Sequence, residues 1–119
     1  MATSKSASPI RLRLIFDGGR ALGPGKADLL QGIAELGSIA AAGRALSMSY
    51  KRAWQLVDDL NKSFARPLVH ASKGGGHGGG ANLTTEGKQV LKLYRDIERK
   101  TQHHSAVEIK RLQALAGRE

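Results

Sequence analysis

The sequence predicts a mainly α-helical fold with a small β component: a winged helix-turn-helix with a glycine-rich wing and a long C-terminal helix. Three observations predict it. Two helical patterns meet across a short polar break within residues 37–64, a basic glycine-rich hairpin pattern follows them, and a long amphipathic helix comes next. The first observation is typical of a helix-turn-helix, whose second helix can enter the major groove of DNA.

The helix-turn-helix pattern begins at Ser38, whose hydroxyl can cap a first helix starting at Ile39. Small residues at 40–43 give this helix a surface that another helix can cross closely. The polar run at 47–49 supplies the break, and Ser49 is the predicted N-cap of the next helix.

The second helix carries one apolar stripe and one polar face. Its stripe has spacings of four, three and four and consists of Ala53, Val57, Leu60 and Phe64. We assign Trp54 to the core. The DNA-contact candidates on and before this helix are Ser38, Ser49, Tyr50, Lys51, Arg52 and Gln55. Of these, Arg52 and Gln55 have the donor groups that pair with base edges, and Lys51 suits a phosphate. The alternative is a plain helical corner with a solvated face.

The segments before the helix-turn-helix are a strand and a helix. Residues 10–16 alternate apolar and basic side chains, which predicts a strand with one buried face and a basic face carrying Arg11 and Arg13. Pro24 suits the start of the following helix, Asp28 lies in its early turns, and Gly37 fits its C-terminal end.

A glycine-rich hairpin is predicted to form the wing. Short strands at 67–70 and 81–83 flank a loop from Ser72 to Gly80. Glycine lets backbone N–H groups approach phosphates closely. The candidate contacts in the loop are Lys73, Gly74, Gly75, Gly76, His77 and Gly78. The alternative is a flexible linker. The loop has no spaced GK[ST] and is therefore not a P-loop.

The C-terminal part predicts one long helix and one short helix. Thr84 can cap the long helix, and Ser105 with Glu108 forms a possible capping box for the second. The apolar face of the second helix has little core left to cover it, so we expect a partner subunit there. The predicted organisation is a disordered lead at 1–9, a DNA-binding domain at 10–104 and a helical segment at 105–119 that serves dimerisation.

Composition favours a polyanionic partner. The formal net charge is +9 with a sequence pI near 10.4, and no acidic residue occurs before Asp17 or between Asp59 and Glu86. The absence of cysteine suits a cytoplasmic protein without disulfides, and no apolar run is long enough for a membrane span or a signal peptide. His103 and His104 are adjacent and lack metal-ligand spacing, so we expect them to be exposed. We expect no enzyme activity, catalytic residue, metal or cofactor.

Two segments carry a resemblance to a known family. GSIAAAGRALSMSYKRAWQLVDDLN, followed by PLVHASKGGGHGGGANLTTEGKQVLKLY, resembles the N-terminal DNA-binding domain of the bacterial molybdate-responsive ModE regulators. LysR-type regulators have similar helices, but their wing is less glycine-rich and they lack the YxxAW pattern. The match covers about Leu12 to Thr101 and implies a winged helix that dimerises on a palindromic operator. In the full regulators, oxyanion-binding β-barrel modules follow, and the sequence ends at Glu119 before any counterpart. We therefore expect no molybdate binding.

The expected function is sequence-specific binding of double-stranded DNA by a homodimeric transcriptional regulator that is ModE-like but lacks the oxyanion-sensing domain. Two alternatives remain at this point. One is a nonspecific architectural DNA-binding protein on the same fold, and the other is a protein-interaction module.

Overall fold

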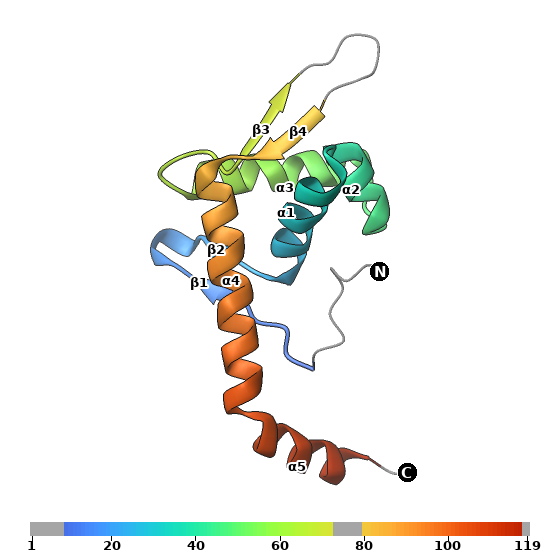
Figure 1. The fold of residues 1–119 in the computed structure, drawn as a ribbon, viewed down its shortest axis with the longest axis vertical. Coiled ribbons are helices and arrows are strands. Elements are labelled where there is room, and N and C mark those ends of the chain that lie inside the picture. The colour runs from blue at the N-terminus through green and yellow to red at the C-terminus, as the bar shows by residue number, and fades with distance from the viewer. Residues whose placement is uncertain (1–8, 73–79, 118–119) are drawn as a thin grey trace.

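The computed structural model describes residues 9–72 and 80–117, which form helices and two small antiparallel sheets (Figure 1). The elements, in chain order, are β1 (Leu14–Ile15), the 3-10 turn η1 (Asp17–Gly19), β2 (Ala21–Leu22), α1 (Pro24–Leu36), α2 (Ile39–Ala45), α3 (Tyr50–Ser63), β3 (Val69–Ser72), β4 (Gly80–Leu83), α4 (Thr85–His104) and α5 (Ala106–Ala116). Three helices, a hairpin and a long helix follow one another as the sequence predicts. The mainly α winged helix-turn-helix is therefore confirmed.

The core lies where α1, α2 and α3 meet under the β3–β4 hairpin (Figure 1). The fully buried large side chains are Leu29, Leu30, Ile33, Leu60, Leu68 and Tyr94. Glycine and alanine let the helices approach closely. A Cβ placed on Gly32 would lie 3.0 Å from that of Ala42, and one on Gly43 would lie 2.9 Å from that of Ala53. Aliphatic rather than aromatic side chains thus hold most of this small core.

The predicted caps set the boundaries of the helix-turn-helix. Gly37 ends α1 in a left-handed conformation with φ 70°, and its N–H donates to the carbonyl of Ile33 at 2.8 Å. The Oγ atoms of Ser38 and Ser49 each accept a backbone N–H at 3.0 Å, from Ala41 and Arg52 respectively. Between α2 and α3, Ser47 has φ 60°, a left-handed conformation that makes this turn sharp.

The N-terminal strand is much shorter than the residues 10–16 that we predicted. Only Leu14 and Ile15 pair, with Leu22 and Ala21 respectively. The partner strand is short because the chain turns back through two glycines, Gly18 and Gly19, with φ near 80°. Side chains alternate as predicted up to Leu14, with Arg11 and Arg13 exposed, but Phe16 is exposed rather than buried. Its ring instead contacts Phe64 edge-on at a centroid distance of 6.0 Å.

The hairpin β3–β4 forms the wing strands. Its register pairs Val69 with Leu83, His70 with Asn82, Ala71 with Ala81 and Ser72 with Gly80. The first strand begins later than predicted and extends to Ser72, which narrows the loop to the residues between Ser72 and Gly80.

Helix α4 docks on the core through its first half. Thr84 caps it by accepting the N–H of Gly87 at 2.9 Å, and Gly87 packs directly against the carbonyl oxygen of Leu68. Further along, the Tyr94 hydroxyl donates to the carbonyl of Leu12 at 2.6 Å. These contacts tie α4 both to the wing and to the N-terminal segment.

Helix α5 follows as predicted, but the capping box at its start is wrong. The Ser105 side chain forms no capping hydrogen bond, and its backbone has φ −103° and ψ 10°, which continues the turn out of α4. No residue of α5 is buried, and its exposed apolar side chains include Val107, Leu112 and Leu115. Among the described residues, no helix combines the length and the apolar character needed to cross a membrane.

Candidate nucleic-acid interface

The N-terminal half of α3 presents a cationic, donor-rich surface. Lys51, Arg52 and Gln55 are all exposed, and the Ser49 cap fixes where their helix begins. Lys51 and Gln55 are one turn apart and therefore form a common ridge directly opposite the buried residues Ala53 and Val57. The helix places them on the side where a groove could receive them.

Arg52 and Tyr50 lie on opposite flanks of that ridge. Because helical residues follow one another at about 100°, Tyr50 and Trp54 face one side and Arg52 the other. The lining of a cleft beside the wing agrees, since it includes both aromatic residues and not Arg52. The structure thus distributes the predicted contacts of α3 over a ridge and two flanks.

The second half of α3 is less suited to a polyanion. Asp58 and Asp59 are exposed there, and the Lys62 ammonium lies 2.8 Å from the Asp58 carboxylate. This hydrogen bond, together with the charge of Asp58, raises the pKa of Lys62. Lys62 is therefore already paired, and the cations available to a nucleic acid lie in the first turns of the helix.

A cleft of about 330 Å³ separates the helix-turn-helix from the wing. It is walled by α2 and the start of α3 on one side and by the wing strands on the other. Of the predicted contacts, it brings together Ser38 and Tyr50. Its lining consists of Ser38, Ile39, Ala40, Arg44, Tyr50, Trp54, Ala71, Ser72, Gly80 and Ala81.

Two residues of this cleft were missed or misassigned by sequence reasoning. Our assignment of Trp54 to the core is wrong, because its side chain is 39% exposed. The position of Trp54 one residue after Ala53 placed it off the apolar stripe, which could have signalled this. Arg44 lies in the last turn of α2 with its side chain exposed, and it is not among the contacts predicted from the sequence. The buried Leu56 was also missing from the predicted stripe.

The wing strands are attached to the helix-turn-helix by specific hydrogen bonds. Asn61 of α3 accepts the N–H groups of Leu68 and Val69 at 2.8 and 3.0 Å, and it donates to the Val69 carbonyl at 3.2 Å. On the other strand, the N–H of Ala81 donates to the carbonyl of Gly37 at 2.9 Å. The wing therefore has a fixed orientation relative to α3. The predicted loop contacts Lys73, Gly74, Gly75, Gly76, His77 and Gly78 lie outside the described residues.

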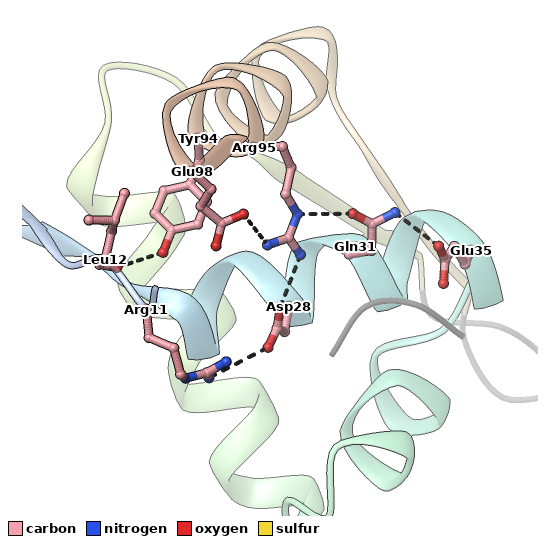
Figure 2. A network of polar contacts seen from close by, with 8 residues as sticks. All are labelled: Arg11, Leu12, Asp28, Gln31, Glu35, Tyr94, Arg95 and Glu98. Carbon is pink, nitrogen blue, oxygen red and sulfur yellow. Dashed lines mark hydrogen bonds and ion pairs between the residues drawn. The ribbon is translucent and has the colours of Figure 1, made fainter. Parts of the chain in front are cut away.

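A polar network holds α4 against α1 on another face of the domain (Figure 2). Buried Asp28 accepts a hydrogen bond from Arg95 at 3.0 Å, and Arg11 approaches its other oxygen at 3.9 Å. Burial disfavours the Arg95 cation, but hydrogen bonds to Asp28 and Glu98 outweigh it and raise the pKa of Arg95. The sequence suggested only a helix-dipole role for Asp28. Its pairing with Arg95 is a distant contact that helix-start patterns do not reveal.

Nothing in the described part of the chain gathers three or more His, Asp or Glu side chains into a possible metal site. His103 and His104 are both exposed at the end of α4, as the sequence predicts. Asp58 and Asp28 instead pair with Lys62 and Arg95 respectively. Among the described residues, Arg44, Lys51 and Arg52 of the helix-turn-helix are exposed cations without a salt bridge.

Comparison with known proteins matches residues 26–88, more than half of the chain, to the family described as bacterial regulatory helix-turn-helix protein, lysR family. This stretch runs from α1 through the wing into α4. The match covers all of α2 and α3 and the cleft beside them. It therefore includes the whole surface described above.

Several individual relatives are ModE proteins. The molybdenum transport protein ModE of Azotobacter vinelandii is 39% identical over 74% of this chain and 33% of its own length. The transcriptional regulator ModE of Haemophilus influenzae is 40% identical over 67% of this chain and 31% of its own length. The DNA-binding transcriptional dual regulator ModE of Escherichia coli K12 is 38% identical over 60% of this chain and 27% of its own length.

This chain spans about a third of the length of the relatives that it matches. Within that third, the similarity confirms the resemblance to the ModE DNA-binding domain that the sequence motifs indicate. The chain belongs to the bacterial regulatory helix-turn-helix proteins of the lysR family, with ModE regulators among its relatives.

Proposed function

We propose that this chain is a sequence-specific, double-stranded-DNA-binding transcriptional regulator acting in the bacterial cytoplasm. The observation that carries the proposal is the exposed first half of α3, where Lys51, Arg52 and Gln55 stand on a capped helix beside a fixed wing. A helix with these donors fits the major groove, whose base edges offer acceptors at guanine and adenine.

Different residues serve different parts of this function. Gln55 and Arg52 read base edges, because amide and guanidinium groups pair bidentately with adenine and guanine. Lys51 contacts phosphate. The Ser38 and Ser49 hydroxyls already accept backbone N–H groups, but each can still donate its own proton to a phosphate oxygen.

Recovery of genomic DNA fragments bound by the chain, followed by motif extraction and fluorescence anisotropy on labelled duplexes, tests the proposal. We expect affinity for the recovered motif to exceed that for random duplex by roughly 10³-fold or more. Equal affinity for all duplexes would identify a nonspecific architectural protein instead. No binding to any duplex at low salt, with retained binding to an acidic protein, would identify a protein-interaction module.

The wing contributes to binding through its loop between the two strands. Because Ser72 pairs with Gly80, replacing residues 73–79 by Asn-Gly should close the hairpin in a tight turn without disturbing the strands. We expect the shortened chain to unfold cooperatively as before and to bind DNA more weakly. Unchanged affinity on every duplex would remove the loop from the interface.

We further propose that the chain forms a homodimer that recognises an inverted repeat. Residues 10–104 form the DNA-binding domain, and residues 105–119 after it form the dimer contact. Support comes from the exposed Val107, Leu112 and Leu115 on α5, which would need a second apolar surface as cover. A two-fold dimer would place two recognition helices on two half-sites. Sedimentation velocity, free and with duplex, should give a dimer. A monomer in both states would contradict it.

Molybdate is proposed not to act on this 119-residue chain. An oxyanion sensor needs an enclosed set of donors, because water competes strongly for the ion. The donors described here, such as Arg44 and Tyr50, instead line an open cleft. Calorimetry at matched ionic strength should show no molybdate binding that sulfate does not reproduce. A stoichiometric, molybdate-selective isotherm would contradict this.

A further inference from the structure

The cleft between the helix-turn-helix and the wing carries a positive charge. Among the described residues that line it, Arg44 is the only charged one, and none of them is a carboxylate. The guanidinium is exposed and forms no salt bridge within residues 9–72 and 80–117. The cleft therefore favours an anionic group.

The same cleft presents two exposed aromatic side chains. Tyr50 is 63% exposed and Trp54 is 39% exposed. Their rings meet edge-to-face at a centroid distance of 6.2 Å, so each restricts the other. Each also carries one hydrogen-bond donor, the phenolic O–H and the indole N–H. Such a surface fits a ligand that is apolar on one side and rich in acceptors on the other.

A sugar-phosphate strand has these properties. Deoxyribose offers apolar C–H surface, and the phosphate beside it offers charged acceptors. Location agrees, because Trp54 lies on α3 between the Lys51–Gln55 ridge and the wing strands. With that ridge in a major groove about 12 Å wide, the strand bordering the groove passes along the flank of the helix. Small residues at Ala71 and Ala81 on the opposite wall leave room for it.

Building on the function proposed above, we propose that this cleft binds one sugar-phosphate strand of duplex DNA. Arg44 contacts a phosphate, and Trp54 packs on the adjoining deoxyribose and donates its indole N–H. Tyr50 supports the indole and adds a second donor. These contacts are to the backbone, so they raise affinity on every sequence rather than selecting one. The cleft also aligns the duplex between α3 and the wing.

The chain contains a single tryptophan, so its own fluorescence tests the proposal directly. A labelled duplex of roughly 30 base pairs, about three helical turns, is titrated into the full chain. Its anisotropy reports binding independently of Trp54. At saturation, we expect acrylamide quenching of Trp54 to fall at least twofold relative to the free protein. Saturated binding with unchanged quenching would overturn the proposal while leaving DNA binding intact. An anisotropy that never rises would instead count against the proposed function as a whole.

A matched pair of arginine variants provides a second test. Arg44→Ala should weaken binding about tenfold, as expected for a hydrogen bond to a charged group. It should also reduce the magnitude of the salt slope by about one and act equally on the preferred motif and on random duplex. Arg20→Ala removes an exposed arginine between η1 and β2, on a hairpin that lies apart from the wing in Figure 1, and should change neither quantity. Equal effects of both variants, or a loss confined to the preferred motif, would overturn the assignment of Arg44 to the backbone.

Discussion

The side-chain amide of Asn61 pairs with the backbone of Val69 in both directions. Its Oδ1 accepts the Val69 N–H at 3.0 Å, and its Nδ2 donates to the carbonyl of the same residue at 3.2 Å. The same Oδ1 also accepts the N–H of Leu68. The Asn61 side chain on α3 thus makes hydrogen bonds to the backbone of Leu68 and Val69 of the kind that a neighbouring β-strand would make.

Asn61→Ala should therefore affect both stability and DNA binding. Loss of the amide leaves the Leu68 and Val69 N–H groups without this acceptor, which should lower the free energy of unfolding by about 1–3 kcal/mol in urea titrations. The wing would also lose its fixed angle to α3, so affinity for DNA should fall in anisotropy measurements at temperatures where the variant is folded. Asn61→Asp keeps the acceptor but loses the donor and should be intermediate. A stability loss with unchanged affinity would limit Asn61 to folding.

Breaking the buried ion pair of Figure 2 should be costly. Arg95→Met leaves Asp28, whose side chain is 6% exposed, with only the more distant Arg11. We expect a loss of about 3 kcal/mol in the free energy of unfolding, the lower end for a broken buried pair because Arg11 remains. The control is Arg99→Met, which removes an exposed partner of Asp96 and should cost about 0–1 kcal/mol. Similar losses of stability in the two variants would show that the buried Asp28–Arg95 pair contributes no more than an exposed pair.

Two glycine-to-alanine substitutions should change the free energy of unfolding in opposite directions. A Cβ on Gly87 would collide with the carbonyl oxygen of Leu68, so Gly87→Ala should force α4 away from the wing. Gly25→Ala places its methyl group in open space within the first turn of α1. We expect Gly87→Ala to lower the free energy of unfolding by about 1–3 kcal/mol or more. Gly25→Ala should raise it by about 0.4–1 kcal/mol. Thermal unfolding followed by circular dichroism decides this. A stable Gly87→Ala variant would mean that the contact relaxes easily.

Arg52→Ala should cost about 1–3 kcal/mol on the preferred DNA motif and relax the preference at one base position. The physical reason is its exposed position in the first turn of the capped helix α3. Lys62→Ala is the control, because that lysine is already paired with Asp58 at the other end of the helix. Competition binding on a set of single-base motif variants measures the effect. An equal loss of affinity on all of them would reassign Arg52 to phosphate contact.

Tyr94, the buried tyrosine of α4, should lose its phenolic proton only at unusually high pH. Burial, assisted by the nearby Glu98 carboxylate, raises the pKa of Tyr94 from 10.0 to about 12. A raised pKa means that the neutral phenol is favoured in the folded chain. The stability that it contributes is present below pH 10 and is lost as the pH rises towards 12. In a Tyr50→Phe chain, the ultraviolet absorbance of tyrosinate should report this one group. Titration near pH 10 in the folded state would contradict the burial of Tyr94.

Local patterns were sufficient to predict much of this fold. Ser38, Ser49 and Thr84 act as helix caps because capping depends on residues within one turn, which a sequence displays directly. The prediction that Ser105 caps α5 failed, because the chain there continues almost helically from α4 and offers no free helix end to cap.

The features that the sequence did not predict depend on contacts between residues that are far apart along the chain. The strand beginning at Ile10 was predicted too long because its length depends on the partner strand, not on its own alternation. Trp54 was assigned to the core from its residue type, whereas in the structure it lines the cleft between α3 and the wing. Neither the Asn61 anchor nor the Asp28–Arg95 pair leaves a local pattern, since each joins segments separated along the chain. The cleft at Arg44 exists only once α2 and the hairpin are placed together.

Helix α4 continues beyond Glu98, its last residue in the network of Figure 2, to His104, a length of about 9 Å. If α5 forms the dimer contact, this length acts as a spacer between the surface that faces DNA and the surface that faces the partner. Inserting one residue after Glu98 would turn α5 by about 100°, whereas inserting seven would restore its direction and move it about 10 Å outwards. The spacing of operator half-sites could therefore change through helix length alone, while every residue that contacts a base stays the same.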